Sequence, residues 1–138
     1  MKSKWFKRLA IGIPVAYAGL VILFESLLGF FQPEMGNTVV IATFDAGQQR
    51  HERVISLVEI DGVGYIAANH WPRAWFRQAR ENPSVEISRG EGFETFNAIL
   101  LQGEEEARVA EIYDPGLVFR FLTGFPPRYF MRLEHRQE

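Results

Sequence analysis

The sequence contains no cysteine, which excludes disulfides, thiolate zinc sites and thiol nucleophiles from the chemistry of this chain. Histidine occurs only three times, so a histidine-rich metal site is not expected and no metal ligand is assigned. The net charge is −2, and the chain lacks the concentrated basic excess that contacts with phosphate groups require. We therefore expect no nucleic acid among its partners.

The chain is also short. Its 138 residues are the usual size of one domain and too few for two well-packed ones. Setting aside a hydrophobic N-terminal segment leaves roughly 105 residues to build a core. A domain of that size gains stability from a bound cofactor or from a second copy, so a homodimer is one expectation.

The N-terminal segment combines basic residues with a long hydrophobic run. The apolar residues extend from position 9 to 31 and are interrupted by small residues, Pro14, Tyr17, Glu25 and Ser26. A bilayer is crossed by about 20 apolar residues, so this run predicts one transmembrane helix. Pro14 falls in the first turns, where a missing N–H costs little. Glu25, near the far end, can face the headgroups or pair with a partner.

A cleaved signal peptide is the alternative, because it begins with the same basic residues. It requires a shorter apolar stretch followed by a small-x-small motif, and residues 29–33 lack that motif, so we favour a retained anchor. The positive charges precede the run, which predicts a cytoplasmic N-terminus and an extracytoplasmic domain. A half-inserted, monotopic helix would instead leave the domain in the cytoplasm. The basic residues are Lys2, Lys4, Lys7 and Arg8.

After a turn-rich linker, short β-rich runs replace the continuous apolarity. This change separates an anchor and linker at 1–36 from a domain at 37–138. Alternating apolar residues and turn signals such as Asp61-Gly62 predict antiparallel strands joined by hairpins. The expected strands are 38–44, 54–60, 64–68, 84–89, 94–102 and 128–133, and the expected helices are 71–81, 104–112 and 114–122.

Six short strands in a chain with 14% aromatic residues predict a small barrel, because closure removes strand edges that would otherwise aggregate. The expected fold class is mainly β (α+β). It is a split β-barrel of about six antiparallel strands with short helices, preceded by one N-terminal transmembrane helix.

The segment 69–87 carries a more specific pattern. An Asn-containing turn precedes a proline, a Trp and a second aromatic residue follow on a short helix, and Asn-Pro-x-Val opens the next strand. With this order of elements, the chain resembles the split-barrel deazaflavin-dependent nitroreductase and quinone reductase family, as a membrane-anchored, divergent member. The resemblance runs from about residue 38 to the C-terminus. The matching positions are Asn69, Pro72, Trp75, Phe76, Asn82, Pro83 and Val85.

The resemblance implies that a flavin-like ring, from the deazaflavin coenzyme or FMN, lies in a groove where the barrel meets the helix. The phosphate tail would be held by the loop between the first two strands and by the helix, since helix N-termini and arginines bind phosphate. Aromatic walls would stack on the ring. His51 is a further loop candidate. The implied cofactor-binding residues are Arg50, Arg53, Ser56, Asn69, Arg73, Trp75 and Arg77.

The first loop departs from the family pattern Thr-Gly-Arg-x-Ser/Thr-Gly. At positions 45–50 the chain reads Asp-Ala-Gly-Gln-Gln-Arg, which loses a basic residue, a hydroxyl and a glycine and gains Asp45. An acidic residue there opposes an anionic tail. Other roles stay open for the same residues. Trp75 fits the barrel core, Arg77 fits a solvated helix face, and Arg50 and Arg53 fit ion-paired loop positions.

Two functions follow. The first is a membrane-tethered flavin- or deazaflavin-dependent oxidoreductase that transfers hydride to an apolar, quinone-like acceptor. The cofactor would supply that chemistry, so no catalytic residue is assigned. The second is a non-catalytic, membrane-anchored split-barrel module that binds a small ligand or a protein, with an eroded cofactor site. The helix pattern favours the first function, while the altered loop and the outward orientation favour the second.

Overall fold

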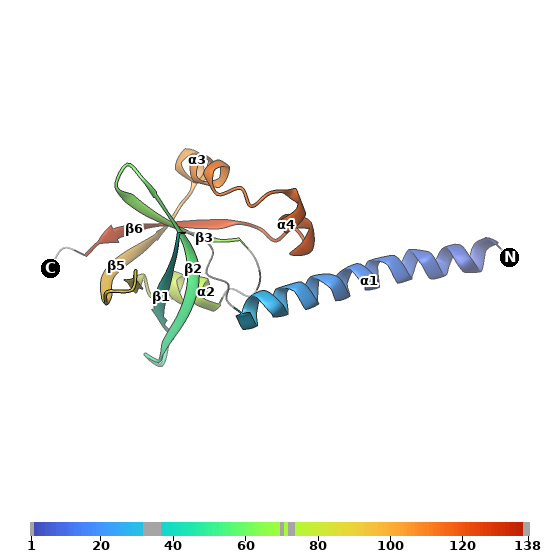
Figure 1. The fold of residues 1–138 in the computed structure, drawn as a ribbon, viewed down its shortest axis with the longest axis horizontal. Coiled ribbons are helices and arrows are strands. Elements are labelled where there is room, and N and C mark those ends of the chain that lie inside the picture. The colour runs from blue at the N-terminus through green and yellow to red at the C-terminus, as the bar shows by residue number, and fades with distance from the viewer. Residues whose placement is uncertain (1, 32–36, 70, 72–73, 137–138) are drawn as a thin grey trace.

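The computed structural model describes residues 2–31, 37–69, 71 and 74–136, and its backbone forms a barrel with one long helix leading away from it (Figure 1). The long helix is α1 (Lys2–Phe31). Of the described residues, α1 is the one helix that is long and apolar enough to cross a membrane, judged by length and composition. Only part of α1 lies beside the barrel, and the rest extends into free space (Figure 1).

Six antiparallel strands close into a barrel in the order β1-β2-β3-β6-β5-β4, with β4 pairing back onto β1. The split-barrel prediction of about six antiparallel strands with short helices is therefore confirmed, as is one long apolar N-terminal helix. The strands are β1 (Thr38–Phe44), β2 (Arg50–Ile60), β3 (Val63–Ala68), β4 (Ser84–Ser88), β5 (Phe93–Leu100) and β6 (Tyr129–His135).

The prediction was wrong about the start of β2. This strand begins at Arg50, four residues before the expected position 54, and Arg50 pairs with Phe44 while Arg53 pairs with Ile41. Because residues 50–53 are polar, the sequence predicts a loop there. Their backbones instead pair with β1 and extend the β1–β2 hairpin. The hairpin between β2 and β3 is as expected, because Asp61 and Gly62 both adopt positive φ, as a tight two-residue turn requires.

The barrel core is plugged by the short helix α2 (Ala74–Glu81), which buries Trp75, Phe76 and Ala79 against the strands. Burial of an aromatic side chain of this size contributes about 1.5–3 kcal/mol. The helix was predicted from position 71, but Trp71 lies in a bend, and residues 70, 72 and 73 are outside the described part. The apolar face of α2 therefore closes one end of the barrel.

A second cluster of buried side chains lies under helix α3 (Gly103–Ile112) and includes Val109, Tyr113 and Phe130. The Tyr113 hydroxyl lies 2.8 Å from the Tyr65 carbonyl oxygen and 3.0 Å from that of Ser56, so it ties α3 to β2 and β3. Burial raises the pKa of the Tyr113 phenol above its usual range.

The last helix, α4 (Leu117–Leu122), begins three residues later than the expected position 114. Asp114 Oδ1 accepts a hydrogen bond from the Gly116 N–H at 3.0 Å, and Gly116 has φ of 82°, so these residues form a turn ahead of the helix. α4 lies against α1. The Tyr17 hydroxyl donates to the Phe121 carbonyl at 2.8 Å, and the Phe24 and Phe119 rings meet edge to face.

Candidate functional site

The β1–β2 loop holds a negative charge of its own. Asp45 Oδ1 accepts hydrogen bonds from the backbone N–H groups of Gly47 and Gln49, each at 2.9 Å, and Asp45 Oδ2 lies 2.9 Å from His51 Nε2. These bonds, that to His51 first, lower the pKa of the Asp45 carboxyl below its usual value. The backbone donors that would meet a phosphate in this loop are thus already bound to a carboxylate.

Arg50, the first predicted phosphate ligand, lies on the outer surface of the hairpin and is ion-paired. Its guanidinium contacts Glu52 and lies 2.9 Å from Glu86 Oε2, and it covers the Phe93 ring at 4.2 Å. Two carboxylates therefore compensate its charge. This is the ion-paired arrangement that the sequence left open as the alternative for Arg50.

Arg53 and Ser56 lie further along β2 and face different surroundings. Arg53 is half-buried, and its Nη1 lies 3.4 Å from the Gly29 carbonyl oxygen in the last turn of α1. A cation at a helix C-terminus is favoured by the helix dipole. Ser56 is exposed, and its carbonyl oxygen accepts a hydrogen bond from the Tyr113 hydroxyl.

Of the remaining predicted ligands, Asn69, Trp75 and Arg77 lie within the described residues. Asn69 Oδ1 accepts a hydrogen bond from Arg128 Nε at 3.2 Å. Trp75 is 8% exposed and packs edge to face on Phe76, so it belongs to the core, as the alternative interpretation predicted. Arg77 is exposed on α2. Arg73 lies outside the described residues. The assignment of these seven residues to a cofactor stays a prediction.

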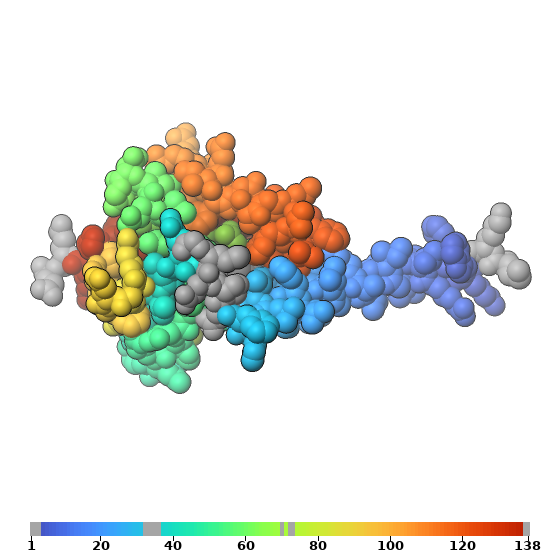
Figure 2. All heavy atoms as spheres, viewed as in Figure 1, coloured from blue at the N-terminus to red at the C-terminus, as the bar shows by residue number. Residues whose placement is uncertain are grey.

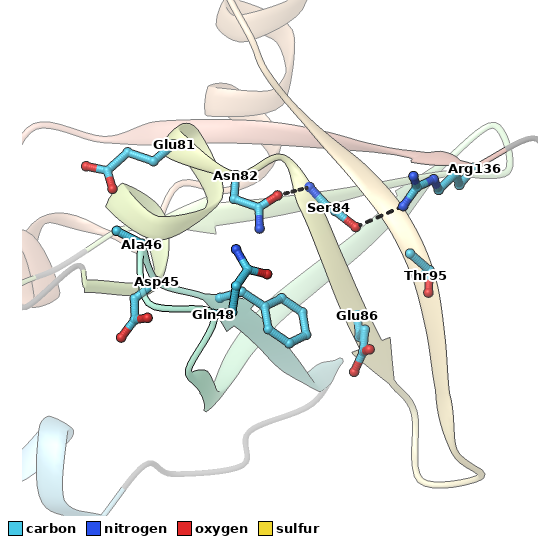
Figure 3. Close-up of a pocket in the computed structure, with 10 residues that line it drawn as sticks. Asp45, Ala46, Gln48, Glu81, Asn82, Ser84, Glu86, Thr95 and Arg136 are labelled. Atoms are coloured by element: carbon cyan, nitrogen blue, oxygen red, sulfur yellow. Dashed lines mark hydrogen bonds between the residues drawn. The ribbon is translucent and has the colours of Figure 1, made fainter.

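A polar pocket of about 780 Å³ opens between the β1–β2 loop, the end of α2 and β4 (Figure 3). Of the six predicted residues that the structure describes, none lines it. Asn82 Oδ1 accepts a hydrogen bond from the Ser84 N–H at 3.3 Å, and Arg136 Nη1 lies 3.4 Å from Ser84 Oγ. The pocket is lined by Phe44, Asp45, Ala46, Gln48, Glu81, Asn82, Ser84, Glu86, Thr95 and Arg136.

The side chains that line the polar pocket carry more carboxylates than cations, with Asp45, Glu81 and Glu86 against Arg136. Asp45 is bound to His51 and Glu86 to Arg50, so these partners compensate part of the negative charge. The acidic excess of the lining still disfavours a phosphate or carboxylate ligand. Within the described part of the chain, no group of three His, Asp or Glu side chains is placed to hold a metal ion. Sequence reasoning missed this pocket because its lining comes from elements far apart in the chain.

A second pocket, of about 350 Å³, lies between α1 and the segment that leads into α2, and we call it the anchor pocket. Glu25 is 7% exposed, and its Oε1 accepts a hydrogen bond from the Trp71 backbone N–H at 3.0 Å. Pairing with a partner is one of the two roles that the sequence suggests for Glu25, and the backbone of Trp71 is such a partner. The anchor pocket is lined by Val21, Ile22, Glu25, Ser26, Gly29 and Trp71, which are mostly apolar or small.

No family model and no curated protein matches this sequence. Solved structures do match. An F420-H2 dependent reductase (FDR-A) is 20% identical, with a TM-score of 0.54, over 71% of this chain and 94% of that one. A putative pyridoxamine 5′-phosphate oxidase from Listeria innocua is 16% identical, with a TM-score of 0.51, over 83% and 94%.

A third solved structure, described as a domain-swapped dimer, is 16% identical with a TM-score of 0.58 and covers 97% of this chain and 100% of that one. These likenesses establish the fold. This chain shares its barrel fold with a protein described as an F420-H2 dependent reductase and with one described as a putative pyridoxamine 5′-phosphate oxidase.

The resemblance of the sequence implies a flavin-type cofactor, and FMN and the deazaflavin coenzyme both carry an anionic phosphate tail. The β1–β2 loop does not fit such a tail, since Asp45 already occupies its backbone donors and the neighbouring pocket is acidic. The exposed Arg77 on α2 is compatible with an anion, but it does not line the polar pocket beside the loop. The anchor pocket, in contrast, fits an apolar group.

Proposed function

We propose that this chain is a membrane-tethered split-barrel binding module that receives an apolar ligand, delivered through the bilayer, in the anchor pocket. The observation that carries this proposal is the composition of the pocket. One wall is the apolar helix α1, and the other is Trp71 at the entrance to the barrel-plugging helix. A ligand dissolved in the membrane would reach this pocket along α1 without crossing water.

The packing of α1 supports its role as a retained tether. Glu25 is buried against the barrel, and Tyr17 and Phe24 pack on α4. Cleavage of a signal peptide would remove these contacts and leave the Trp71 N–H without the Glu25 carboxylate. With basic residues at the start of α1, the positive-inside rule then favours an extracytoplasmic barrel.

The chemistry of the anchor pocket favours a planar or chain-like apolar molecule with one polar edge. Ligand pockets range over about 300–1,000 Å³ and are lined mostly by apolar side chains with a few polar groups, and this pocket meets both criteria. The Trp71 indole offers a stacking face, and Glu25 and Ser26 are the polar side chains among the described residues that line the pocket. A quinone-like molecule has these features.

The second candidate is a membrane-tethered reductase that uses a flavin or deazaflavin cofactor and passes hydride to a quinone-like acceptor in the anchor pocket. The shared fold with an F420-H2 dependent reductase, over 94% of that chain, favours it. The cofactor would then be held without the β1–β2 loop. A homodimer would supply further surface for it, and the domain-swapped neighbour supports a dimer of this fold.

The test uses the full chain in detergent micelles, in a Trp5→Phe background so that Trp71 and Trp75 report. A naphthoquinone is titrated and tryptophan quenching is recorded, and FMN and the deazaflavin coenzyme are titrated by absorbance. The binding module predicts saturable quenching by the quinone and no stoichiometric cofactor binding. Stoichiometric binding of either cofactor would establish the second candidate. Quenching that never saturates would overturn both the pocket and the ligand class.

Two glycines of α1 give a matched pair of variants. Gly29 lines the anchor pocket and Gly12 does not, and in both cases an added Cβ meets open space. Gly29→Leu should fill the pocket and abolish saturable quenching. Gly12→Leu should leave the quinone titration unchanged, because it adds the same side chain to the same helix away from the barrel.

A further inference from the structure

α4 exposes apolar side chains although it is part of a folded domain. None of its six residues is buried. Leu117 and Val118 are 72% and 74% exposed, and Phe121 and Phe125 are 47% and 49% exposed. Four large apolar side chains on one short segment form an exposed surface that calls for an occupant.

The position of this surface on α1 identifies the occupant. Tyr17 and Phe24 pack on Phe121 and Phe119, and a Cβ on Gly124 would come within 3.1 Å of Val21 Cγ1. Figure 2 shows the segment that contains α4, in orange, seated against α1 while the N-terminal part of α1 stands clear. The exposed side chains of α4 are thus continuous with the apolar surface of α1.

The length of α1 decides how deep α4 lies. Residues 2–16, which precede the first α4 contact, span about 22 Å at 1.5 Å per residue, whereas the hydrocarbon core is about 30 Å thick. The first of these residues are basic, and the apolar run starts at Leu9. Twenty apolar residues counted from Leu9 end at residue 28, so they include Tyr17, Val21 and Phe24. A helix α1 that crosses the bilayer therefore brings its α4 contacts into the hydrocarbon.

We propose that α4 and the turn that follows it form a second membrane-inserted element. Leu117, Val118 and Phe121 of α4, with Phe125 of the turn, enter the acyl region of the leaflet that holds the C-terminal half of α1. This inference rests on the tether in the proposed function. The barrel then sits directly on the lipid surface. Arg120, exposed and 5.8 Å from the Phe125 ring centroid, extends from the same turn towards the headgroups.

Insertion of α4 also places the anchor pocket. The pocket residues Val21 and Ile22 lie on the same turns of α1 as the α4 contacts. The pocket, which extends along α1 from Val21 to Gly29, therefore runs from the acyl region to its boundary with the headgroups, where a lipid-soluble ligand with a polar edge collects. With α4 inserted, the barrel is held against the membrane and the anchor pocket is in contact with lipid.

The absence of native cysteine allows a direct test with single-cysteine variants of the full chain. Val118→Cys reports on α4, Ile13→Cys on the free part of α1, and Glu91→Cys on the exposed β4–β5 turn. Each is labelled with an environment-sensitive fluorophore and reconstituted in phosphatidylcholine and phosphatidylglycerol vesicles. Quenching by nitroxide-labelled phospholipid is compared with quenching by aqueous iodide.

The proposal expects the labels at positions 118 and 13 to show blue-shifted emission and to lose most of it to nitroxide lipid, while the label at 91 responds to iodide alone. A label at 118 that only iodide quenches overturns the insertion of α4. One that neither quencher reaches also overturns it and points to a second copy of the chain covering α4. If the label at 13 is itself in water, the tether has failed and with it the proposed function.

Discussion

The carboxylate of Glu25 and the backbone of Trp71 form a directional contact between α1 and the barrel, with 3.0 Å between Glu25 Oε1 and Trp71 N. Glu25 lies in the apolar part of α1, and a carboxylate removed from water costs free energy unless it is hydrogen-bonded. The hydrogen bond to Trp71 therefore gives a structural reason for an acidic residue in the hydrophobic run. It also forms part of the polar edge of the anchor pocket.

Replacing this carboxylate should loosen the helix from the barrel. Glu25→Leu leaves the Trp71 N–H without its acceptor, and we expect a loss of about 1–3 kcal/mol in the free energy of unfolding. Glu25→Gln keeps an acceptor oxygen and should lose clearly less. Denaturant unfolding of the full chain in micelles, followed by tryptophan fluorescence, measures both. Equal losses for Gln and Leu would show that the bond to Trp71 contributes nothing.

Gly124 should tolerate no side chain, for two reasons. Its φ is +75°, and a Cβ there would come within 3.1 Å of Val21 Cγ1. We expect Gly124→Ala to cost about 1–2 kcal/mol from the backbone alone and to separate α4 from α1. Gly103→Ala is the control, because φ there is +70° and the space beside it is open. Thermal unfolding compares the two variants, and identical destabilisation would argue against close packing of α4 on α1.

The Asp45 carboxylate should stabilise the β1–β2 hairpin in a pH-dependent way. Its pKa is lowered from 3.8 by the hydrogen bond with His51 and by those from the loop backbone. A group with a lowered folded pKa stabilises above its unfolded value and loses that stabilisation as the pH falls through the folded pKa. Asp45→Ala should therefore lower the Tm at pH 5 to 7, and the difference from wild type should shrink towards pH 2. A difference that stays constant with pH would contradict the role of the charge.

The contribution of the Tyr113 phenol to stability should decrease as the pH rises, which is the opposite of the pH dependence expected for Asp45. Burial raises its pKa above the ordinary value of 10, so its contribution is complete below pH 10 and is lost as the pH rises further. Tyr113→Phe removes the bond to the Tyr65 carbonyl and should cost about 0.5–1.5 kcal/mol at pH 7. Denaturant unfolding between pH 7 and 11 checks this. The gap between variant and wild type should narrow above pH 10, and a gap that widens there would refute the assignment.

Much of the fold follows from local pattern. Strand alternation and the Asp61-Gly62 turn correctly predict the barrel hairpins, and most element ends agree within two residues. The exceptions have physical causes. The residues Arg50 to Arg53 look like a loop because charged side chains suit a hairpin rim as well as a turn. The start of α4 shifts because Asp114 and Gly116 form a turn that helical periodicity does not reveal.

The candidate site was harder to predict than the fold. The gain of Asp45 was visible in the sequence as a departure from a phosphate loop, but its bonds to Gly47 and Gln49 depend on the loop conformation. The anchor pocket depends on α1 meeting Trp71, two segments separated by about half of the barrel strands in the chain. No periodicity encodes such a meeting. No periodicity encodes the packing of Phe121 on Tyr17 either, and the membrane depth that we propose for α4 depends on it.

α1 meets the barrel through two separate segments, since Glu25 bonds to Trp71 while Tyr17 and Phe24 hold α4. A single contact would allow the barrel to rotate about that point, whereas two separate contacts restrict this rotation. The barrel therefore cannot turn about the axis of the helix, and rotation of α1 carries the whole domain with it. In the membrane-tethered state that we propose, the side of the barrel that a neighbouring protein meets would therefore depend on the rotation of α1 about its own axis.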